Sequence, residues 1–155
     1  MSLAGKRSLK ESLRSLFKPS EQASSIPVSG QQALPKGKPV IPILPQTVRR
    51  LDKLVSKWVE GKGYRMPDRT IEDAARRIGT DSATLYRYFQ TRGEDFRTFR
   101  SRLRLEDAMV MLLEDRESSA TVIGQRVGFN DRANFTHQFK DYTGFTPDAW
   151  RKMHP

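Results

Sequence analysis

The chain has 155 residues, of which 36% are hydrophobic, and it contains no run of 18 or more apolar residues that could span a membrane. It has no cysteine and only two histidines, which excludes disulfide bonds, cysteine-ligated zinc, iron–sulfur clusters and thiol catalysis. The net charge of +10 favours a polyanionic partner, either nucleic acid or an acidic membrane surface, although such a charge can also serve solubility alone.

The first 45 residues differ in composition from the rest of the chain. Six of the nine prolines lie there, and residues 19–45 are predicted to be an extended linker because each proline ring removes a donor and restricts its predecessor. An apolar helical face flanked by basic residues precedes the linker and consists of Leu9, Leu13, Leu16 and Phe17. This short amphipathic basic helix could be a frayed tail, a membrane-surface contact or a partner contact.

Helical periodicity begins near residue 46 and continues to the end of the chain. An apolar stripe of helical spacing, which we expect to end at Gly61 and Gly63, consists of Val48, Leu51, Val55, Trp58 and Val59. No segment alternates with a period of two, so the sequence predicts an all-α fold without a sheet.

A pair of shorter helices follows. Thr70 is placed to cap the first of them, with Asp73 at the third position of a weak capping box. The second, Ser82 to Phe89, begins after a glycine turn and is capped by Asp81.

A longer helix is predicted from Glu94 to Glu114. It has two apolar faces, one with Phe96, Phe99, Leu103 and Val110 and another with Leu105, Ala108 and Leu112. Two apolar faces suit a helix that is held between two small bundles.

The helix pair before the long helix recurs after it. Gly79 and Gly128 are 49 residues apart, and the anchors Leu85 and Phe135 are 50 apart. Each half reads as a short helix, a glycine turn and a second helix, which is the helix-turn-helix pattern. The 20 residues from Glu94 to Leu113 would form a helical spacer of roughly 30 Å between the two halves. This length is close to the roughly 34 Å between successive major-groove faces on one side of B-DNA.

The residues of this repeat resemble the AraC/XylS-type DNA-binding domain, over about residues 48–151. The motifs that carry the resemblance are Ala75, Gly79, Leu85 to Phe89, Gly93 to Phe96, Arg102 to Leu105, Ala108, Leu112, Arg126 to Asp131, Phe135, Phe139–Lys140, Thr143 to Pro147 and Trp150–Arg151. The resemblance implies a sequence-specific transcription regulator that inserts two recognition helices into adjacent major grooves of promoter DNA.

Three residues depart from the family pattern. Ala120 stands where Ile or Leu is usual, and Gly124 stands where Ala is usual. Both remove buried surface or helix propensity, so the first helix of the second unit is predicted to be the weakest of the domain. His137 replaces a common Arg, and neutral His offers only one donor.

The candidate DNA-binding residues are the outward neighbours of the apolar anchors on the two recognition helices, with Lys140 added as a phosphate contact. They are Ser82, Ala83, Tyr86, Arg87, Arg132, Ala133, Thr136, His137 and Lys140. Arg87 and Arg132 could donate to guanine, and Ala133 and Thr136 could contact a thymine methyl. The alternative for Arg87 is an ion pair with Glu94 or Asp95, and for Tyr86 it is partial burial. Thr70 and the amides at helix starts are further phosphate candidates.

The domain prediction therefore divides the chain into residues 1–45, and 46–155 as an AraC-type domain with parts 46–92, 93–115 and 116–155. We expect no enzyme activity, metal or cofactor, because no phosphate loop, nucleophile elbow or histidine pair is present. The expected partners are double-stranded DNA and RNA polymerase, in the cytoplasm. The chain is either a short stand-alone regulator or the output part of a larger sensor, whose N-terminal sensor domain or membrane segment would lie outside this sequence. The alternative is a helical protein-interaction module without specific DNA readout.

Overall fold

The computed structural model describes residues 42–68 and 70–155, of which Ile43–Pro155 form one compact unit. The predicted amphipathic helix and nearly all of the predicted linker lie outside the described residues. The elements are α2 (Pro45–Glu60), the 3-10 helix η2 (Gly63–Arg65), α3 (Ile71–Ile78), α4 (Ser82–Thr91), α5 (Phe96–Glu114), α6 (Ala120–Arg126), α7 (Arg132–Thr143) and α8 (Pro147–Met153). The described residues contain no strand, which confirms the all-α prediction.

The helices begin where side-chain caps and prolines place them. Pro45 is the first residue of α2, one residue before the predicted domain boundary, where its missing N–H costs nothing. Thr70 accepts a hydrogen bond from the amide of Asp73, as the capping box predicts. Asp95 caps α5 through the amide of Thr98, so this helix starts two residues later than predicted.

Helix α2 ends where the sequence predicts, at Glu60 with Gly61 as its C-cap, but the two glycines have different roles there. Gly61 has an ordinary negative φ, and the residue in the left-handed conformation is Lys62, with φ of 57°. Gly63 is required for a different reason, since a Cβ there would lie 2.2 Å from the Trp58 ring. The glycines mark the end of the helix, but only the second is needed there, and for close packing.

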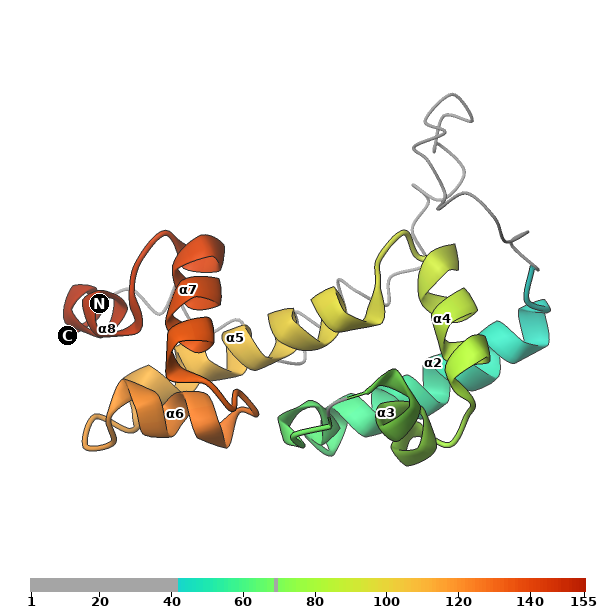
Figure 1. The fold of residues 1–155 in the computed structure, drawn as a ribbon, viewed down its shortest axis with the longest axis horizontal. Helices are drawn as coiled ribbons and strands as arrows, with labels where there is room; N and C mark the ends of the chain where they lie inside the picture. Colours follow the sequence, from blue (N-terminus) through green and yellow to red (C-terminus); the bar gives the residue numbers. More distant parts are fainter. Residues whose placement is uncertain (1–41, 69) are drawn as a thin grey trace, which may run out of the picture. The chain divides into compact units, whose positions relative to one another are not determined.

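Helix α5 contributes to the cores of both halves of the domain, and α4 and α7 lie toward its opposite ends (Figure 1). Near its start, Phe96 and Phe99 pack on Phe89 with ring centroids 5.5 and 4.9 Å apart. The second core consists of Leu105, Ala108, Leu112, Ile123, Val127, Phe129, Phe135 and Phe139. The prediction of two buried faces is right except for Val110, which is 37% exposed.

Gly124 is buried where α6 meets α7. A Cβ at this position would lie 2.6 Å from a carbon of the Phe135 ring. The missing methyl group therefore leaves no void, because the aromatic ring occupies its space. Trp150 covers the same core, with its ring 6.1 Å from that of Phe139.

Candidate nucleic-acid interface

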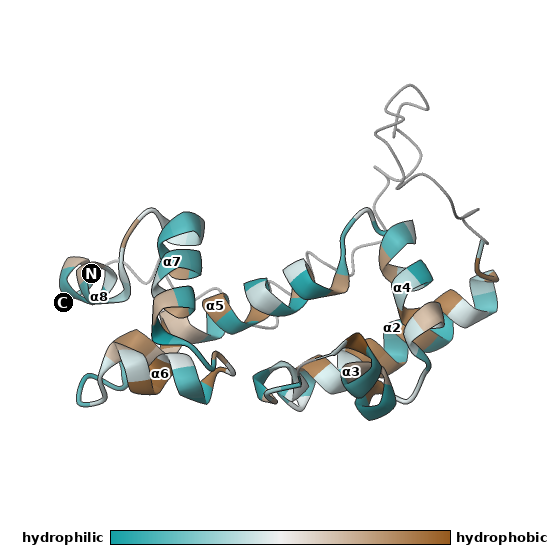
Figure 2. Ribbon diagram, viewed as in Figure 1, coloured by the Kyte–Doolittle hydropathy of each residue, from teal (hydrophilic) through white to brown (hydrophobic). Residues whose placement is uncertain are grey.

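The two predicted recognition helices, α4 and α7, bury one side and leave the other open. Leu85, Tyr88 and Phe89 are buried on α4, and Phe135 and Phe139 are buried on α7. Figure 2 shows α7 as mostly hydrophilic, in contrast to α6. The open sides carry the candidate DNA-binding residues, and those of α4 recur on α7 exactly one repeat of 50 residues later.

Both recognition helices start in the same way. Asp81 accepts a hydrogen bond from the amide of Thr84 at 2.8 Å, and Asp131 accepts one from the amide of Asn134 at 3.1 Å. Hydrogen bonding to Thr84 also lowers the pKa of Asp81. These caps fix the first turn of each helix, which is the part that a helix-turn-helix unit presents to base edges.

On α4 the predicted face is accessible. Tyr86 is 48% exposed and Ala83 is exposed, while Ser82 and Arg87 are partly exposed. The Nε of Arg87 donates to the carbonyl oxygen of Ala83 in its own helix at 3.3 Å. Glu94 instead pairs with Arg102, so the ion pair considered for Arg87 does not form among residues 42–68 and 70–155.

On α7 the predicted face is more exposed. Arg132, Ala133 and Lys140 are exposed, and Thr136 is partly exposed. His137 lies 3.2 Å from the carboxylate of Asp141, on the same open surface. The negative charge of Asp141 disfavours a phosphate next to His137, whereas Arg132 and Lys140 are exposed cations on the same face.

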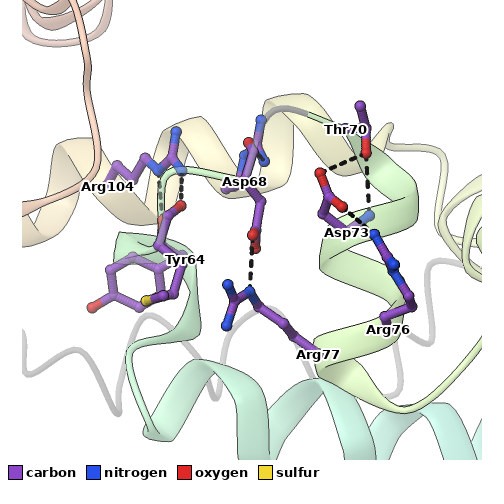
Figure 3. A network of polar contacts seen from close by, with 9 residues as sticks. Tyr64, Asp68, Thr70, Asp73, Arg76, Arg77 and Arg104 are labelled. Carbon is purple, nitrogen blue, oxygen red and sulfur yellow. Dashed lines mark hydrogen bonds and ion pairs between the residues drawn. The ribbon is translucent and has the colours of Figure 1, made fainter.

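The repeat extends to ion pairs that hold the loop before each first helix, of which Figure 3 shows the pair in the first unit. Asp68 pairs with Arg77 at 2.8 Å, and Asp115 pairs with Arg126 at 2.6 Å. The hydroxyl of Thr70 donates to Asp73, which also pairs with Arg76. The side chain of Thr70 is therefore occupied by its two bonds to Asp73, as a helix cap.

Four residues that the sequence analysis did not name as candidate site residues form a largely buried network, which we call the clamp: Tyr64, Arg65, Arg104 and Asp107. Arg104 and Asp107 are only 7% and 5% exposed. Burial and the neighbouring Asp107 carboxylate raise the pKa of the Tyr64 hydroxyl, while burial lowers the pKa of Arg104 to about 10. The sequence feature that could have identified this network is a charge at inward positions of α5, where Arg104 and Asp107 interrupt the apolar faces.

Within the described ranges no helix is long and apolar enough to cross a bilayer. Among the same residues, no cluster of three or more histidines and acidic side chains could hold a metal ion.

Two helix pairs of this kind, each with an exposed second helix and joined through α5, define a tandem helix-turn-helix protein. A family model described as a helix-turn-helix domain matches residues 74–153. The chain therefore belongs to this family, of the AraC type, which is a family of DNA-binding rather than enzymatic domains.

The chain is similar to the uncharacterized transcriptional regulatory protein YesN of Bacillus subtilis (strain 168). The identity is 39% over 64 residues, which cover 41% of this chain and 17% of that protein. The chain thus matches less than a fifth of the length of this curated relative.

Solved structures agree with the fold. A protein of unknown function from Listeria innocua has a TM-score of 0.58 and 27% identity, covering 68% of this chain and 97% of that one. The C-terminal domain of AraT, a response regulator from Geobacillus stearothermophilus, has a TM-score of 0.56 and 25% identity, covering 71% and 86%. The C-terminal domain of the response regulator yesN from Fusobacterium nucleatum has a TM-score of 0.58 and 26% identity, covering 66% and 98%.

Proposed function

We propose that this chain is a transcription regulator that reads promoter DNA with α4 and α7, each placed in one of two adjacent major grooves. The observation that carries this proposal is the repeated open face, Ser82, Ala83, Tyr86 and Arg87 on α4 and Arg132, Ala133, Thr136 and His137 on α7. A monomer with two such faces would contact two half-sites, as a dimer does when each subunit has one recognition helix.

The residues of the two faces would have different roles. Arg87 and Arg132 can donate two hydrogen bonds to a guanine, while Ala133 and the methyl group of Thr136 fit a thymine methyl. Lys140 is exposed toward the end of α7 and would contact a phosphate, which fixes position rather than sequence. The net charge of +10 would add a sequence-independent attraction that weakens as salt is raised.

The similarity to response-regulator domains supports a wider proposal. We infer that the chain acts in the cytoplasm as the DNA-binding output of a larger sensory protein, and that RNA polymerase is its functional partner at the promoter. The relatives that support this are C-terminal domains of response regulators.

The test is selection of duplexes from a random library by the full chain, followed by titration of a selected and a scrambled duplex at several salt concentrations. We expect a selected motif with two half-sites and tighter binding than to the scrambled duplex at every salt concentration. Equal affinity for both duplexes, with the same salt dependence, would instead support a helical interaction module that carries only nonspecific charge.

Arg132→Ala tests the assignment of the second face. The variant should bind its selected duplex about 1–3 kcal/mol more weakly and lose preference at one base pair, because a two-donor contact to guanine is removed. Arg116→Ala is the control, since this exposed arginine donates to the carbonyl oxygens of Leu113 and Arg151, away from the recognition face. Equal weakening of binding to all duplexes would show that Arg132 contacts a phosphate and not a base.

A further inference from the structure

At the centre of the clamp, the carboxylate of Asp107 on α5 accepts three hydrogen bonds from side chains of η2. Arg65 donates to both carboxylate oxygens of Asp107, from Nε at 2.5 Å and from a terminal nitrogen at 2.8 Å. The hydroxyl of Tyr64 donates to the same carboxylate at 3.0 Å. The carboxylate lies in the second half of α5, whereas Tyr64 and Arg65 lie on η2, between α2 and α3, so these bonds connect the segment that precedes the first helix pair to the second half of the long helix.

Arg104 adds a second attachment one turn earlier on α5. Its guanidinium donates to the carbonyl oxygens of Tyr64 and Met66, at 2.5 and 2.7 Å (Figure 3). The bonds go to backbone oxygens, so Arg104 fixes the path of residues 64–66 whatever their side chains are. Together with the bonds to Asp107, the bonds from Arg104 to the carbonyl oxygens before and after Arg65 hold η2 against α5.

The turn of the second helix pair packs against the same place. The guanidinium of Arg104 lies 5.9 Å from the centre of the Phe129 ring. A Cβ on Gly128 would lie 2.7 Å from Nε of Arg104 and 2.8 Å from the carbonyl oxygen of Arg65. The backbone of this turn is therefore in direct contact with the clamp, and the two halves of the domain touch each other as well as α5.

We propose that the clamp sets the orientation of the second helix-turn-helix unit relative to the first, making its four residues positioning residues for the spacing of two DNA half-sites. A helix alone connects two bundles at one point and lets them swing as it bends. Here η2, α5 and the Gly128 turn close a ring of contacts, which removes that freedom.

The consequence for DNA rests on the proposed function. If α4 and α7 enter adjacent grooves, a fixed orientation permits one spacing, because an added base pair turns the second site by about a tenth of the roughly 10-base-pair helical repeat. A chain with a loosened clamp would accept several spacings, while its affinity for each single half-site stays the same.

A distance measurement without DNA tests the orientation by itself. The chain has no cysteine, so spin labels can be attached at Glu72→Cys on α3 and Asp148→Cys on α8, both exposed and outside the proposed DNA faces. We expect a narrow distance distribution in the otherwise unchanged full chain and a broad one after Arg65→Ala. The matched control is Arg77→Ala, which breaks an ion pair to an equally buried carboxylate within the first unit.

Arg65→Lys keeps the positive charge but cannot donate to both carboxylate oxygens of Asp107, so it should also broaden the distance distribution. It serves as the second variant in case Arg65→Ala does not fold. A distribution that stays narrow in the folded Arg65 variants, or that broadens as much after Arg77→Ala, would overturn the proposal.

Binding to duplexes then tests the effect on spacing. With the two-half-site duplex selected by the full chain, insertion of two base pairs should weaken binding by about tenfold or more, the loss expected for even one poor base contact. Arg65→Ala should reduce that loss severalfold while single-half-site binding is unchanged. Selection of no duplex would refute the proposed function and leave the distance result standing; an unchanged spacing penalty would refute the clamp alone.

Discussion

The two helix-turn-helix units use the same local design but pack their turns differently. Gly79 and Gly128 occupy equivalent positions with φ of 100° and 109°. A Cβ on Gly79 would meet only Leu54, at 3.8 Å, whereas one on Gly128 would meet Arg104 and the backbone of Arg65 within 3 Å. The turn at Gly79 is therefore open, whereas the turn at Gly128 packs against the other half of the domain. A glycine at the same place in both units thus meets different packing constraints, which the sequence does not reveal.

The largest expected effect comes from alanine at these two glycines. Gly79→Ala should lower the free energy of unfolding by about 1–2 kcal/mol, the cost of a left-handed conformation for an L-residue. Gly128→Ala should cost about 1–3 kcal/mol more, because the methyl group also overpacks the interface. Urea denaturation of both variants measures the difference, and equal losses would show that the second turn is as open as the first.

The contacts between the first and second helices of each unit should give the next largest effect. The second unit has Gly124 and Phe135 where the first has Ala75 and Leu85. Gly124→Ala should destabilise the domain, since overpacking against Phe135 costs about 1–3 kcal/mol and exceeds the roughly 0.5–1 kcal/mol that alanine gains in a helix.

Phe135→Leu should relieve that clash and give the second unit the pair found in the first. In a double-mutant cycle we expect a favourable coupling of about 0.5–3 kcal/mol between the two changes. As the control, Ala75→Gly should cost only about 0.5–1 kcal/mol. Strict additivity of Gly124→Ala and Phe135→Leu would show that the ring moves away from the added methyl group.

These positions also show which features of the fold and of the candidate site can be predicted from the sequence. The spacing of Leu85 and Phe135, the cap at Asp81 and, apart from Val110, the two faces of α5 follow from periodicity and local chemistry, and the sequence predicts them. The candidate DNA-binding residues follow from the same periodicity, and the structure adds only that their side chains are accessible to solvent. The partner of a buried charge is not periodic: Asp107 could be recognised as an anomaly on α5, whereas its pairing with Arg65 depends on how η2 folds back.

Helix α6 and its counterpart α3 should differ in local stability. Ile123, Gly124 and Val127 bury α6 on one side, but Val122 is 37% exposed and the helix has only seven residues. Its glycine weakens the helical state relative to α3, which has Ala75 at that position. Amide hydrogen exchange should therefore be fastest, among the buried helices, in residues 121–127. Slower exchange there than in α3 would show that Phe135 packing outweighs the glycine.

The smallest expected effect concerns the ion pair before α6. Hydrogen bonds from Ser118 and the charge of Arg126 lower the pKa of Asp115 from its ordinary value of 3.8. A carboxylate with a lowered pKa in the folded state stabilises that state above its unfolded pKa, and this contribution is lost as the pH falls toward the folded pKa. Asp115→Asn should thus be less stable than the unchanged chain at pH 6, and the difference should shrink between about pH 4 and pH 2.

Glu117→Gln, at an exposed carboxylate with no bond to any described residue, is the control in the same loop and should show no such convergence. A stability difference that stays constant down to pH 2 would mean that Asp115 acts through its geometry, as a turn former, and not through its charge.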